Sequence, residues 1–265
     1  MLSGRQELRR EQFFDRLEEV GSAVLALDYD GTLAPFKKDR NAAVPYPGVR
    51  KLIGQIMAKG HTRVVIISGR PVHEVQSLLQ LTPSPEIWGA HGLQRLRSNG
   101  ECETGKIEDS DRALLGEAIA SVRRYNFDRL AEVKPGSVAV HWRGLPEAET
   151  QKIRSKLQPE WAPIAASGRM SLLEFDGGIE LRVNGFDKGK VARTIISELP
   201  PGTPFAFLGD DATDEDAFRV LQGNGGFTIL VRDQWRETEA DVWIRPPEEL
   251  FDFLTEWLKR SGGEP

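Results

Sequence analysis

With 265 residues, 39% of them hydrophobic and 28% charged, the chain is long enough for one large domain or for a core that carries an insert. Its net charge of −5 argues against nonspecific nucleic-acid binding, and a single cysteine, Cys102, excludes both an intrachain disulfide and a cysteine-rich metal site. The sequence contains neither a signal peptide nor the roughly 18 consecutive apolar residues of a membrane span, so we expect a soluble cytoplasmic protein.

The first and last parts of the chain predict strands that alternate with helices. Short apolar runs that end in polar turns indicate buried strands, and apolar residues three or four apart indicate helices. In chain order we expect a helix over 6–20, a strand over 23–27, a helix over 47–59, a strand over 63–67, a helix over 71–81, strands over 87–91 and 205–208, a helix over 214–221, and strands over 227–231 and 241–244.

The middle of the chain has a different pattern, with paired strands and two helices. We expect a helix over 111–124, strands over 130–134 and 137–142, a helix over 147–157, and strands over 171–175 and 179–183. The whole pattern predicts an α/β fold, in which a parallel-sheet core with helices on both faces (residues 1–106 and 182–265) carries an inserted α+β domain (residues 107–181).

The first polar cluster, Asp28 to Thr32, follows a predicted buried strand. A carboxylate can accept a phosphoryl group if a neighbouring acid protonates the leaving oxygen and then activates water. Asp28 and Asp30 fit these two roles, Gly31 allows a turn whose amides face phosphate oxygens, and Thr32 adds a hydroxyl. An isolated Asp-x-Asp would more often be a solvated turn, but its place after a buried strand favours catalysis.

The second cluster, residues 209–216, contains five acids that repel one another unless a cation lies close. Magnesium prefers oxygen ligands, so we expect Mg²⁺ to be held by Asp210, Asp28 and the Asp30 carbonyl. We expect Asp214, with Asp211, to support that site by bracing a metal-bound water or Lys188. The helix macrodipole is sufficient to explain acids at the two following positions, 215 and 216.

Two further segments offer groups that bind phosphate. Lys188 stands near the start of a predicted helix that Asp187 can cap, and it could neutralise the nucleophile and the phosphate. Ser68 and the Gly69 amide follow another predicted strand and could hold a phosphate oxygen. Taken alone, either segment could equally be an ordinary surface lysine or strand-to-helix turn.

Together these segments resemble the haloacid dehalogenase superfamily of phosphotransferases. The matching residues are, in order, Asp28, Asp30, Gly31, Thr32, Ser68, Lys188, Gly209, Asp210, Asp211 and Asp214. The resemblance implies a Rossmann-like hydrolase core, magnesium and an aspartyl-phosphate intermediate. It also implies that the insert is a cap domain of the kind that many sugar phosphatases carry.

A narrower resemblance, to the trehalose-6-phosphate phosphatase family, covers residues 27–35, 67–70, 89–92, 132–134, 141–143, 180–182, 187–189 and 209–218. It implies that the substrate-binding residues are Arg70, His91, Glu132, Lys134, His141, Arg143 and Glu180. Glu132 and Lys134 should share one face of a strand and could also be a simple surface pair. Where the family usually has a lysine, this chain has Asp176, for which Arg169 could substitute. Gln94 replaces a common glutamate.

The resemblance therefore predicts a phosphatase that hydrolyses trehalose 6-phosphate through a phosphorylated Asp28. It also implies a functional link to a trehalose-6-phosphate synthase, with no nucleic-acid or membrane partner. Another sugar phosphate, such as sucrose 6-phosphate or a glycosyl phosphoglycerate, remains open because of Asp176. A phosphomutase and an inactive sugar-phosphate-binding subunit of a synthase complex are weaker alternatives.

Overall fold

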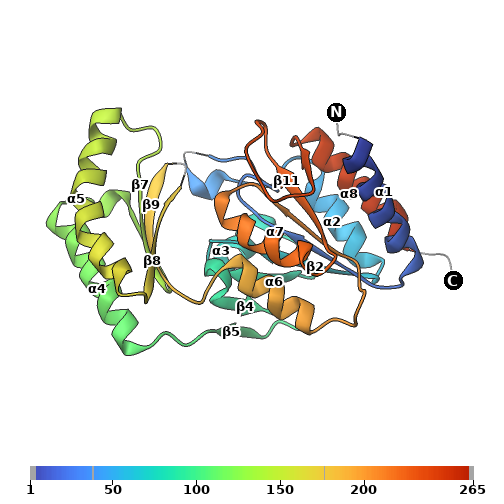
Figure 1. Cartoon of the computed structure of the whole chain (residues 1–265), viewed down its shortest axis with the longest axis horizontal. Coiled ribbons are helices and arrows are strands. Elements are labelled where there is room, and N and C mark those ends of the chain that lie inside the picture. The colour runs from blue at the N-terminus through green and yellow to red at the C-terminus, as the bar shows by residue number, and fades with distance from the viewer. Residues whose placement is uncertain (1–3, 38, 176, 263–265) are drawn as a thin grey trace. The chain divides into compact units, whose positions relative to one another are not determined.

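The computed structural model of the chain describes residues 4–37, 39–175 and 177–262. The chain divides into two compact units, one made of residues 1–103 and 187–265 and the other of residues 104–186 (Figure 1). The smaller unit is thus an insert in the larger one, and each unit is built around its own sheet.

The larger unit contains an eight-stranded sheet in the order β12-β11-β10-β1-β2-β3-β4-β5. Every pairing from β12 to β3 is parallel, and β4 then runs antiparallel to β3. The strands are β1 (Ala23–Leu27), β2 (Thr62–Ile67), β3 (Glu86–Gly89), β4 (Gln94–Leu96), β5 (Cys102–Thr104), β10 (Phe205–Gly209), β11 (Phe227–Val231) and β12 (Val242–Ile244).

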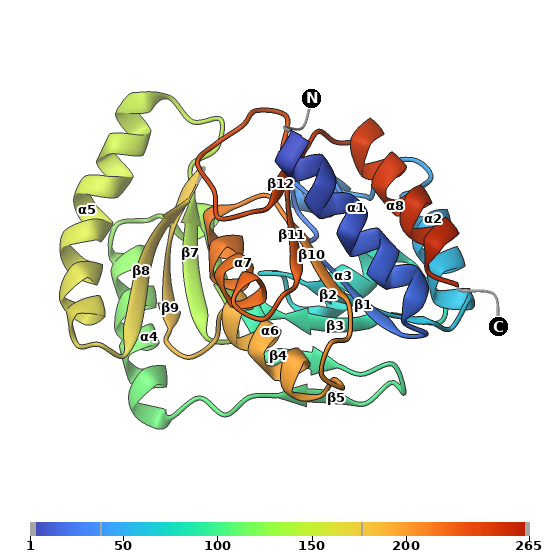
Figure 2. The same cartoon turned by 45° about the vertical axis from the view of Figure 1, so that its right-hand side comes forward.

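Helices cover both faces of this sheet, which confirms the expected α/β class. Its helices are α1 (Gly4–Glu19), α2 (Val49–Ala58), α3 (Val72–Leu79), α6 (Lys188–Ser197), α7 (Glu215–Gln222) and α8 (Glu248–Arg260). Leu25 and Leu27 of β1 pack with α1, α2, α3 and α8, whereas Val24 and Ala26 point to the opposite core, which α6 and α7 complete. Figure 2 shows α1, α2 and α8 gathered over one side of the sheet.

The smaller unit has an antiparallel sheet in the order β6-β7-β9-β8, with two helices. Its elements are α4 (Asp109–Arg124), β6 (Ala131–Lys134), β7 (Ser137–His141), α5 (Glu147–Ala166), β8 (Met170–Phe175) and β9 (Gly178–Val183). Val138 and Leu181 are fully buried on the apolar face of the sheet, while the polar residues of the same strands lie on the other face. The insert therefore has the expected α+β character. Its last strand, β9, extends two residues beyond the expected boundary at residue 181.

Two local expectations were wrong, and one helix was not predicted. The helix expected to end at residue 157 continues through Pro159 to Ala166, because Trp161 is buried and its indole nitrogen donates to the Ser121 hydroxyl at 2.9 Å. The strand expected over 87–91 ends at Gly89, since His91 and its predecessor adopt left-handed backbone angles. Helix α8 was not expected at all, although it packs directly on α2.

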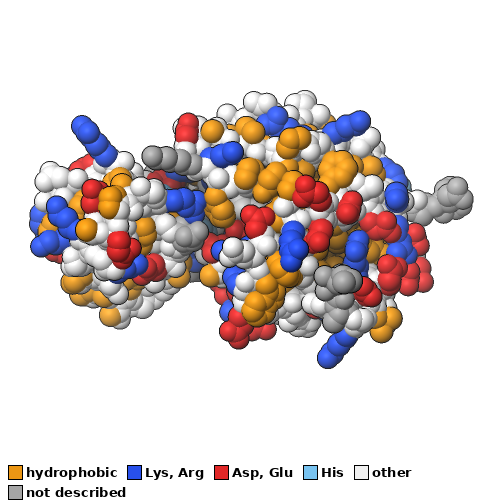
Figure 3. Space-filling model, turned by 90° about the horizontal axis from the view of Figure 1, so that it is seen from above, with side chains coloured by type: hydrophobic (Ala, Val, Ile, Leu, Met, Phe, Trp, Pro, Cys, Tyr) orange, Lys and Arg blue, Asp and Glu red, His pale blue; other side chains and the backbone are white. Residues whose placement is uncertain are grey.

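Two further observations concern the charges on the surface and the length of the helices. On the face shown in Figure 3, acidic and basic side chains are interspersed rather than gathered into a field of one sign. Within the described part of the chain, no helix combines the length and the apolar character that a bilayer-spanning segment requires.

Candidate active site

Three neighbouring strands end in the polar clusters. Asp28 follows β1, Ser68 follows β2 and Asp210 follows β10, and β1 pairs in parallel with both of the other strands. The carboxyl ends of parallel strands meet at one edge of the sheet, where α/β proteins bind ligands. The Asp28 amide donates to the Leu208 carbonyl at 2.8 Å, which ties the first cluster to the strand that precedes the second.

A buried ammonium joins two of the acids. Lys188 Nζ donates to Asp28 Oδ1 and to Asp214 Oδ1, both at 2.6 Å, and all three side chains are almost fully buried. Asp187 accepts a hydrogen bond from the Lys190 amide at 2.6 Å and so caps α6 as expected. The cap fixes the first turn of the helix, from which Lys188 extends.

Asp210 completes a group of three buried carboxylates. Asp28, Asp210 and Asp214 each offer an oxygen, and these oxygens lie within 4.8 Å of one another. Neither carboxylate oxygen of Asp210 has a hydrogen-bond partner, although both are buried. When fully ionised, these three carboxylates beside the ammonium of Lys188 have two excess negative charges in a site away from solvent.

The acidity of the group reflects this excess of negative charge. Burial raises the pKa of Asp28 to about 7 against the opposing charge of Lys188. Burial, together with the charges of Asp28 and Asp214, also raises the pKa of Asp210. Burial alone would lower the pKa of Lys188, but Asp214 and Asp28 outweigh it and raise that pKa. The ammonium is therefore a permanent charge, and the carboxylates favour a further cation.

Asp214 holds the main chain at the end of β10. Its Oδ2 accepts hydrogen bonds from the amides of Asp210 at 3.0 Å and Asp211 at 2.9 Å. A methyl group at Gly209 would lie 2.3 Å from Asp214 Cγ, so glycine is needed there for this close approach. The Asp211 carboxylate turns back to the Ala212 amide at 2.7 Å, so it acts on the backbone of this turn.

Gly31 and Thr32 lie against the same acids. Gly31 has φ +85°, and a Cβ at this position would lie 2.2 Å from Asp210 Oδ2, so only glycine fits. The Thr32 hydroxyl is buried and has no hydrogen-bond partner in the structure. A buried hydroxyl without a partner is rare and suits a group that receives a ligand.

Asp30 is held by an arginine from the next strand end. Arg70 Nε donates to Asp30 Oδ2 at 2.6 Å and Arg70 Nη2 to Asp30 Oδ1 at 2.7 Å. The Arg70 side chain is only 7% exposed, also lies 3.5 Å from Glu74, and covers the ring of Tyr29. Two parallel hydrogen bonds fix the direction of a carboxylate, so Arg70 orients Asp30.

The turn after β2 packs closely on His91. The Ser68 hydroxyl accepts from the Arg70 amide at 3.1 Å, and the Ser68 carbonyl accepts from the His91 amide at 3.0 Å. A Cβ at Gly69 would lie 2.7 Å from the His91 ring, and His91 itself has φ +57°. Gln94, which replaces the common glutamate, accepts from the Val72 amide at 3.1 Å and so caps α3.

In the smaller unit, four of the expected substrate-binding residues lie on one face of the sheet. Lys134 Nζ lies 3.5 Å from Glu132 Oε1 and 3.7 Å from Glu180 Oε1. His141 Nε2 lies 2.9 Å from Glu132 Oε2, and the Ser137 hydroxyl donates to Glu180 at 2.7 Å. The lysine lies between the two acids, and all three side chains, each at most 15% exposed, form a polar cluster.

The remaining expected residues of that unit are outside this cluster. Arg143 follows β7, is exposed, and packs against Gly177, where an added Cβ would lie 2.9 Å from that of Arg143. Arg169 donates to Asp111 Oδ1 at 2.6 Å, so its charge is already paired. Asp176 lies outside the residues that the structure describes.

Two arginines and an acid on the outer side of the acidic turn were not predicted from the sequence. Arg232 and Arg236, in the loop after β11, donate to main-chain carbonyls of this turn. Glu215, explained above by the helix dipole alone, is nearly buried and bonds to the same loop. Pairing of acids and arginines some twenty residues apart leaves no local sequence pattern.

Comparison with known proteins adds the family. The trehalose-phosphatase family model matches residues 26–241, a span that includes every acid of the site. The chain belongs to the trehalose-phosphatase family. It is 33% identical over 241 residues to a trehalose-phosphate phosphatase from Mycobacterium marinum, an alignment that covers 85% of this chain and 59% of that protein. The chain thus spans a little over half of the length of this relative.

Two further matches extend the comparison. A bifunctional trehalose-6-phosphate synthase/phosphatase from Thermoproteus tenax is 28% identical over 227 residues, covering 85% of this chain and 31% of that protein. The C-terminal domain of the C. albicans trehalose-6-phosphate phosphatase superposes with a TM-score of 0.79 at 19% identity, covering 96% of this chain and 97% of that domain. The last match supports the fold.

Proposed function

We propose that this protein is a magnesium-dependent phosphatase that hydrolyses trehalose 6-phosphate to trehalose and phosphate. Membership of the trehalose-phosphatase family supports the substrate class. The chemistry rests on one observation, the buried group in which Lys188 contacts Asp28 while Asp210 has two unpartnered oxygens nearby. A family member that only bound sugar phosphate would have no need of this arrangement.

The residues of this group fit a divalent cation. Asp210 has two buried oxygens without partners, Asp28 lies close to it, and the group has two excess negative charges when it is fully ionised. Carboxylate oxygens are the ligands that Mg²⁺ prefers. Asp28, Asp210 and the Asp30 carbonyl would hold Mg²⁺, and Asp214 and Asp211 would support the turn. Bound there, Mg²⁺ supplies positive charge to the transferring phosphoryl group.

Asp28 and Asp30 divide the chemistry between them. The Asp28 carboxylate attacks phosphorus while the bond to the sugar oxygen breaks, and Asp30, which enters this step protonated, gives that oxygen its proton. The deprotonated Asp30 then takes a proton from water, which attacks the phosphorus of the aspartyl phosphate and releases phosphate. Arg70, with its two hydrogen bonds to Asp30, keeps this carboxyl group in one orientation.

The charge and hydrogen-bond donors of the site bind the phosphate. Lys188 is fixed between Asp28 and Asp214 and stabilises the added negative charge. Ser68 and the Thr32 hydroxyl, with the main-chain amide of Gly69, donate to phosphate oxygens, whereas the Gly31 amide donates to the Ala34 carbonyl at 2.7 Å. Catalysis of phosphoryl transfer depends mainly on such positioning and charge stabilisation.

For recognition of the sugar we propose His91 and Arg70 in the larger unit and, in the smaller unit, the residues named next. Glu132, Glu180 and His141 offer acceptors to sugar hydroxyls, and Lys134 and Arg143 offer donors. The mutual contacts of the first four residues hold these groups in place without a ligand.

A substrate panel tests this function. Purified protein with Mg²⁺ is incubated with trehalose 6-phosphate, sucrose 6-phosphate and a glycosyl phosphoglycerate, and free phosphate is measured. We expect the highest kcat/KM for trehalose 6-phosphate and no turnover by Asp28→Asn, with an unchanged far-UV circular dichroism spectrum. Preference for another ester would change the substrate, transfer of phosphate to another hydroxyl would indicate a phosphomutase, and no release would indicate a binding subunit.

The proposed substrate also indicates a partner. The Thermoproteus tenax relative is named as a bifunctional synthase/phosphatase, in which 31% of the chain aligns with this protein. We propose a functional link to a trehalose-6-phosphate synthase, which supplies the substrate. Co-purification with that synthase, or channelling of labelled substrate between the two proteins, would test it.

A further inference from the structure

Two arginines hold the outer side of the turn that carries Asp210. Arg232 Nη1 lies 3.3 Å from the Asp210 carbonyl oxygen and Arg236 Nε lies 3.4 Å from it. Arg236 Nη2 donates to the Asp211 carbonyl at 2.8 Å. These guanidinium groups therefore contact the main chain of the turn and leave the Asp210 carboxylate itself uncontacted.

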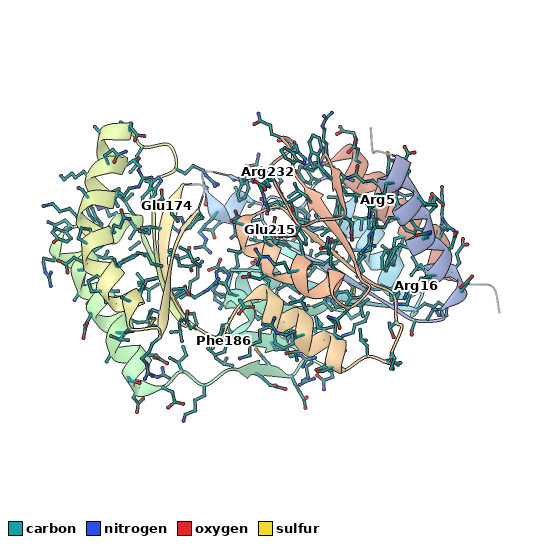
Figure 4. The ribbon with its side chains drawn as sticks, viewed as in Figure 1. Arg5, Arg16, Glu174, Phe186, Glu215 and Arg232 are labelled. Atoms are coloured by element: carbon teal, nitrogen blue, oxygen red, sulfur yellow. The ribbon has the colours of Figure 1, made fainter. Side chains whose placement is uncertain are left out.

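Arg236 is in turn fixed by an acid of α7. Its Nη1 donates to Glu215 Oε1 at 2.5 Å and to the Glu237 carbonyl at 2.8 Å. Glu215 also accepts from the Thr238 hydroxyl and from the Glu239 amide, both at 2.8 Å. Figure 4 shows Glu215 at the start of α7 and Arg232 in the neighbouring loop. The side chains of Glu215 and Arg236 are 11% and 24% exposed, so water screens this contact only in part.

Hydrogen bonds thus hold the turn on two sides. On the inner side, Asp214 accepts from the amides of Asp210 and Asp211; on the outer side, the arginines donate to the carbonyls of the same two residues. Because the Asp210 carboxylate has no hydrogen bond of its own, its position depends on its main chain. Groups that do not bind the metal but fix the orientation of a metal ligand commonly influence the affinity of the site.

We propose that Arg236, supported by Glu215 and Arg232, is a positioning residue that holds Asp210 ready for a divalent cation. This inference rests on the proposed function, because it takes the metal site from there. Arg236 donates to the carbonyls of Asp210 and Asp211 and not to the Asp210 carboxylate, so it acts through the main chain of residues 210 and 211. Loss of the guanidinium leaves the acidic turn free to move Asp210 away from Asp28, which weakens the metal site.

The shape of the guanidinium group matters as much as its charge. Arg236 uses three nitrogens to reach three carbonyls and one carboxylate at once. A lysine ammonium is a compact charge that cannot span these acceptors together. Arg236→Lys should therefore keep part of the effect and Arg236→Gln should lose it.

The experiment measures metal binding without turnover. Binding of Mn²⁺, as a spectroscopic probe for the divalent site, is followed by electron paramagnetic resonance for wild type, Arg236→Gln, Arg236→Lys and Glu215→Gln. Arg219→Gln is the matched control, since Arg219 is exposed and pairs with Asp216 at 2.9 Å on the same helix. Asp210→Asn tests the site itself. The Mg²⁺ concentration for half-maximal phosphatase activity is measured in parallel.

We expect Arg236→Gln to weaken Mn²⁺ binding about 10-fold or more, the usual range for groups behind a metal ligand, and to raise the half-saturating Mg²⁺ in proportion. At saturating Mg²⁺ its kcat should return to within about threefold of wild type, as expected when only metal affinity is lost. Arg236→Lys and Glu215→Gln should be intermediate, and Arg219→Gln should match wild type.

Two results separate the inference from the proposed function. If Asp210→Asn binds Mn²⁺ as tightly as wild type, the metal site of the proposed function is wrong. If Asp210→Asn loses binding but Arg236→Gln and Glu215→Gln do not, the site stands and the positioning role of Arg236 is overturned. Should Arg236→Gln not fold, Arg236→Lys and Glu215→Gln decide, because wild-type affinity in both would refute the role.

Discussion

Replacing Asp210 by asparagine should stabilise the metal-free protein while removing its response to Mg²⁺. The wild-type carboxylate is buried without a hydrogen bond, and Asp28 and Asp214 lie within 4.8 Å. A buried charged group left without a partner costs about 1–3 kcal/mol or more. Asparagine removes the charge and brings an amide that can donate to a neighbouring carboxylate, so most of this cost should disappear.

The size of the effect should depend on pH. A protein with an acid whose pKa is raised on folding loses stability as the pH rises from the pKa of the unfolded state through that of the folded state. Burial raises the pKa of Asp210, and that of Asp28 reaches about 7. The repulsion is therefore complete only above pH 7. A gain of 1–3 kcal/mol corresponds to roughly 3–10 °C in Tm for a chain of this size, and it should shrink at pH 5.

Thermal unfolding in EDTA, at pH 5 and pH 8, measures this directly, followed by the same scans with saturating Mg²⁺. Asp216→Asn is the matched control, because it removes an exposed acid of the same segment. Wild type should gain stability from Mg²⁺ and Asp210→Asn should not. A lower Tm for Asp210→Asn than for wild type in EDTA at pH 8, or equal stabilisation of both proteins by Mg²⁺, would refute this prediction.

Three further changes test other parts of the structure. Gly31→Ala places a methyl group 2.2 Å from Asp210 Oδ2 and should lower kcat at least about 100-fold, whereas Gly21→Ala, with open space around it, should leave kcat unchanged in the phosphate-release assay. Glu180→Gln should raise KM for trehalose 6-phosphate about 10-fold or more but leave KM for p-nitrophenyl phosphate within twofold, and equal effects on both would argue against a sugar-binding role. Glu198 forms hydrogen bonds with Arg95 and Arg63 that lower its pKa from 4.5 to about 2, so wild type should lose stability as pH falls through that interval. Glu198→Gln should lose less over the same interval, and parallel acid-unfolding curves would contradict this.

The fold class could be predicted because its determinants are local. A buried run such as residues 23–27 indicates a strand by composition alone, and alternation with helices then leaves few arrangements other than a parallel sheet. Helix ends were harder to predict. Pro159 argues for the end of a helix, yet the packing of Trp161 on the neighbouring helix carries α5 to Ala166, and that contact lies 40 positions away in the chain.

The candidate site likewise combines residues that local motifs identify with residues that only distant contacts bring together. Asp28, Asp30 and Asp210 stand in short motifs at strand ends, which is why the sequence pointed to them. What holds them is distant in the chain: Arg70 is 40 positions from Asp30, and Arg236 is 26 from Asp210. Arg70 belongs to the segment 67–70 that resembles the family, but its contact with Asp30 is known only from the structure.

The proposed mechanism requires that Asp28 carry the phosphoryl group during turnover, and this can be measured. Protein mixed with trehalose 6-phosphate and Mg²⁺ is quenched within a turnover and treated with borohydride, which reduces an aspartyl phosphate to homoserine. Peptide mass spectrometry then locates the change. We expect homoserine at position 28 in wild type and none in Asp28→Asn. Conversion at Asp30, or continued release of phosphate by Asp28→Asn, would contradict it.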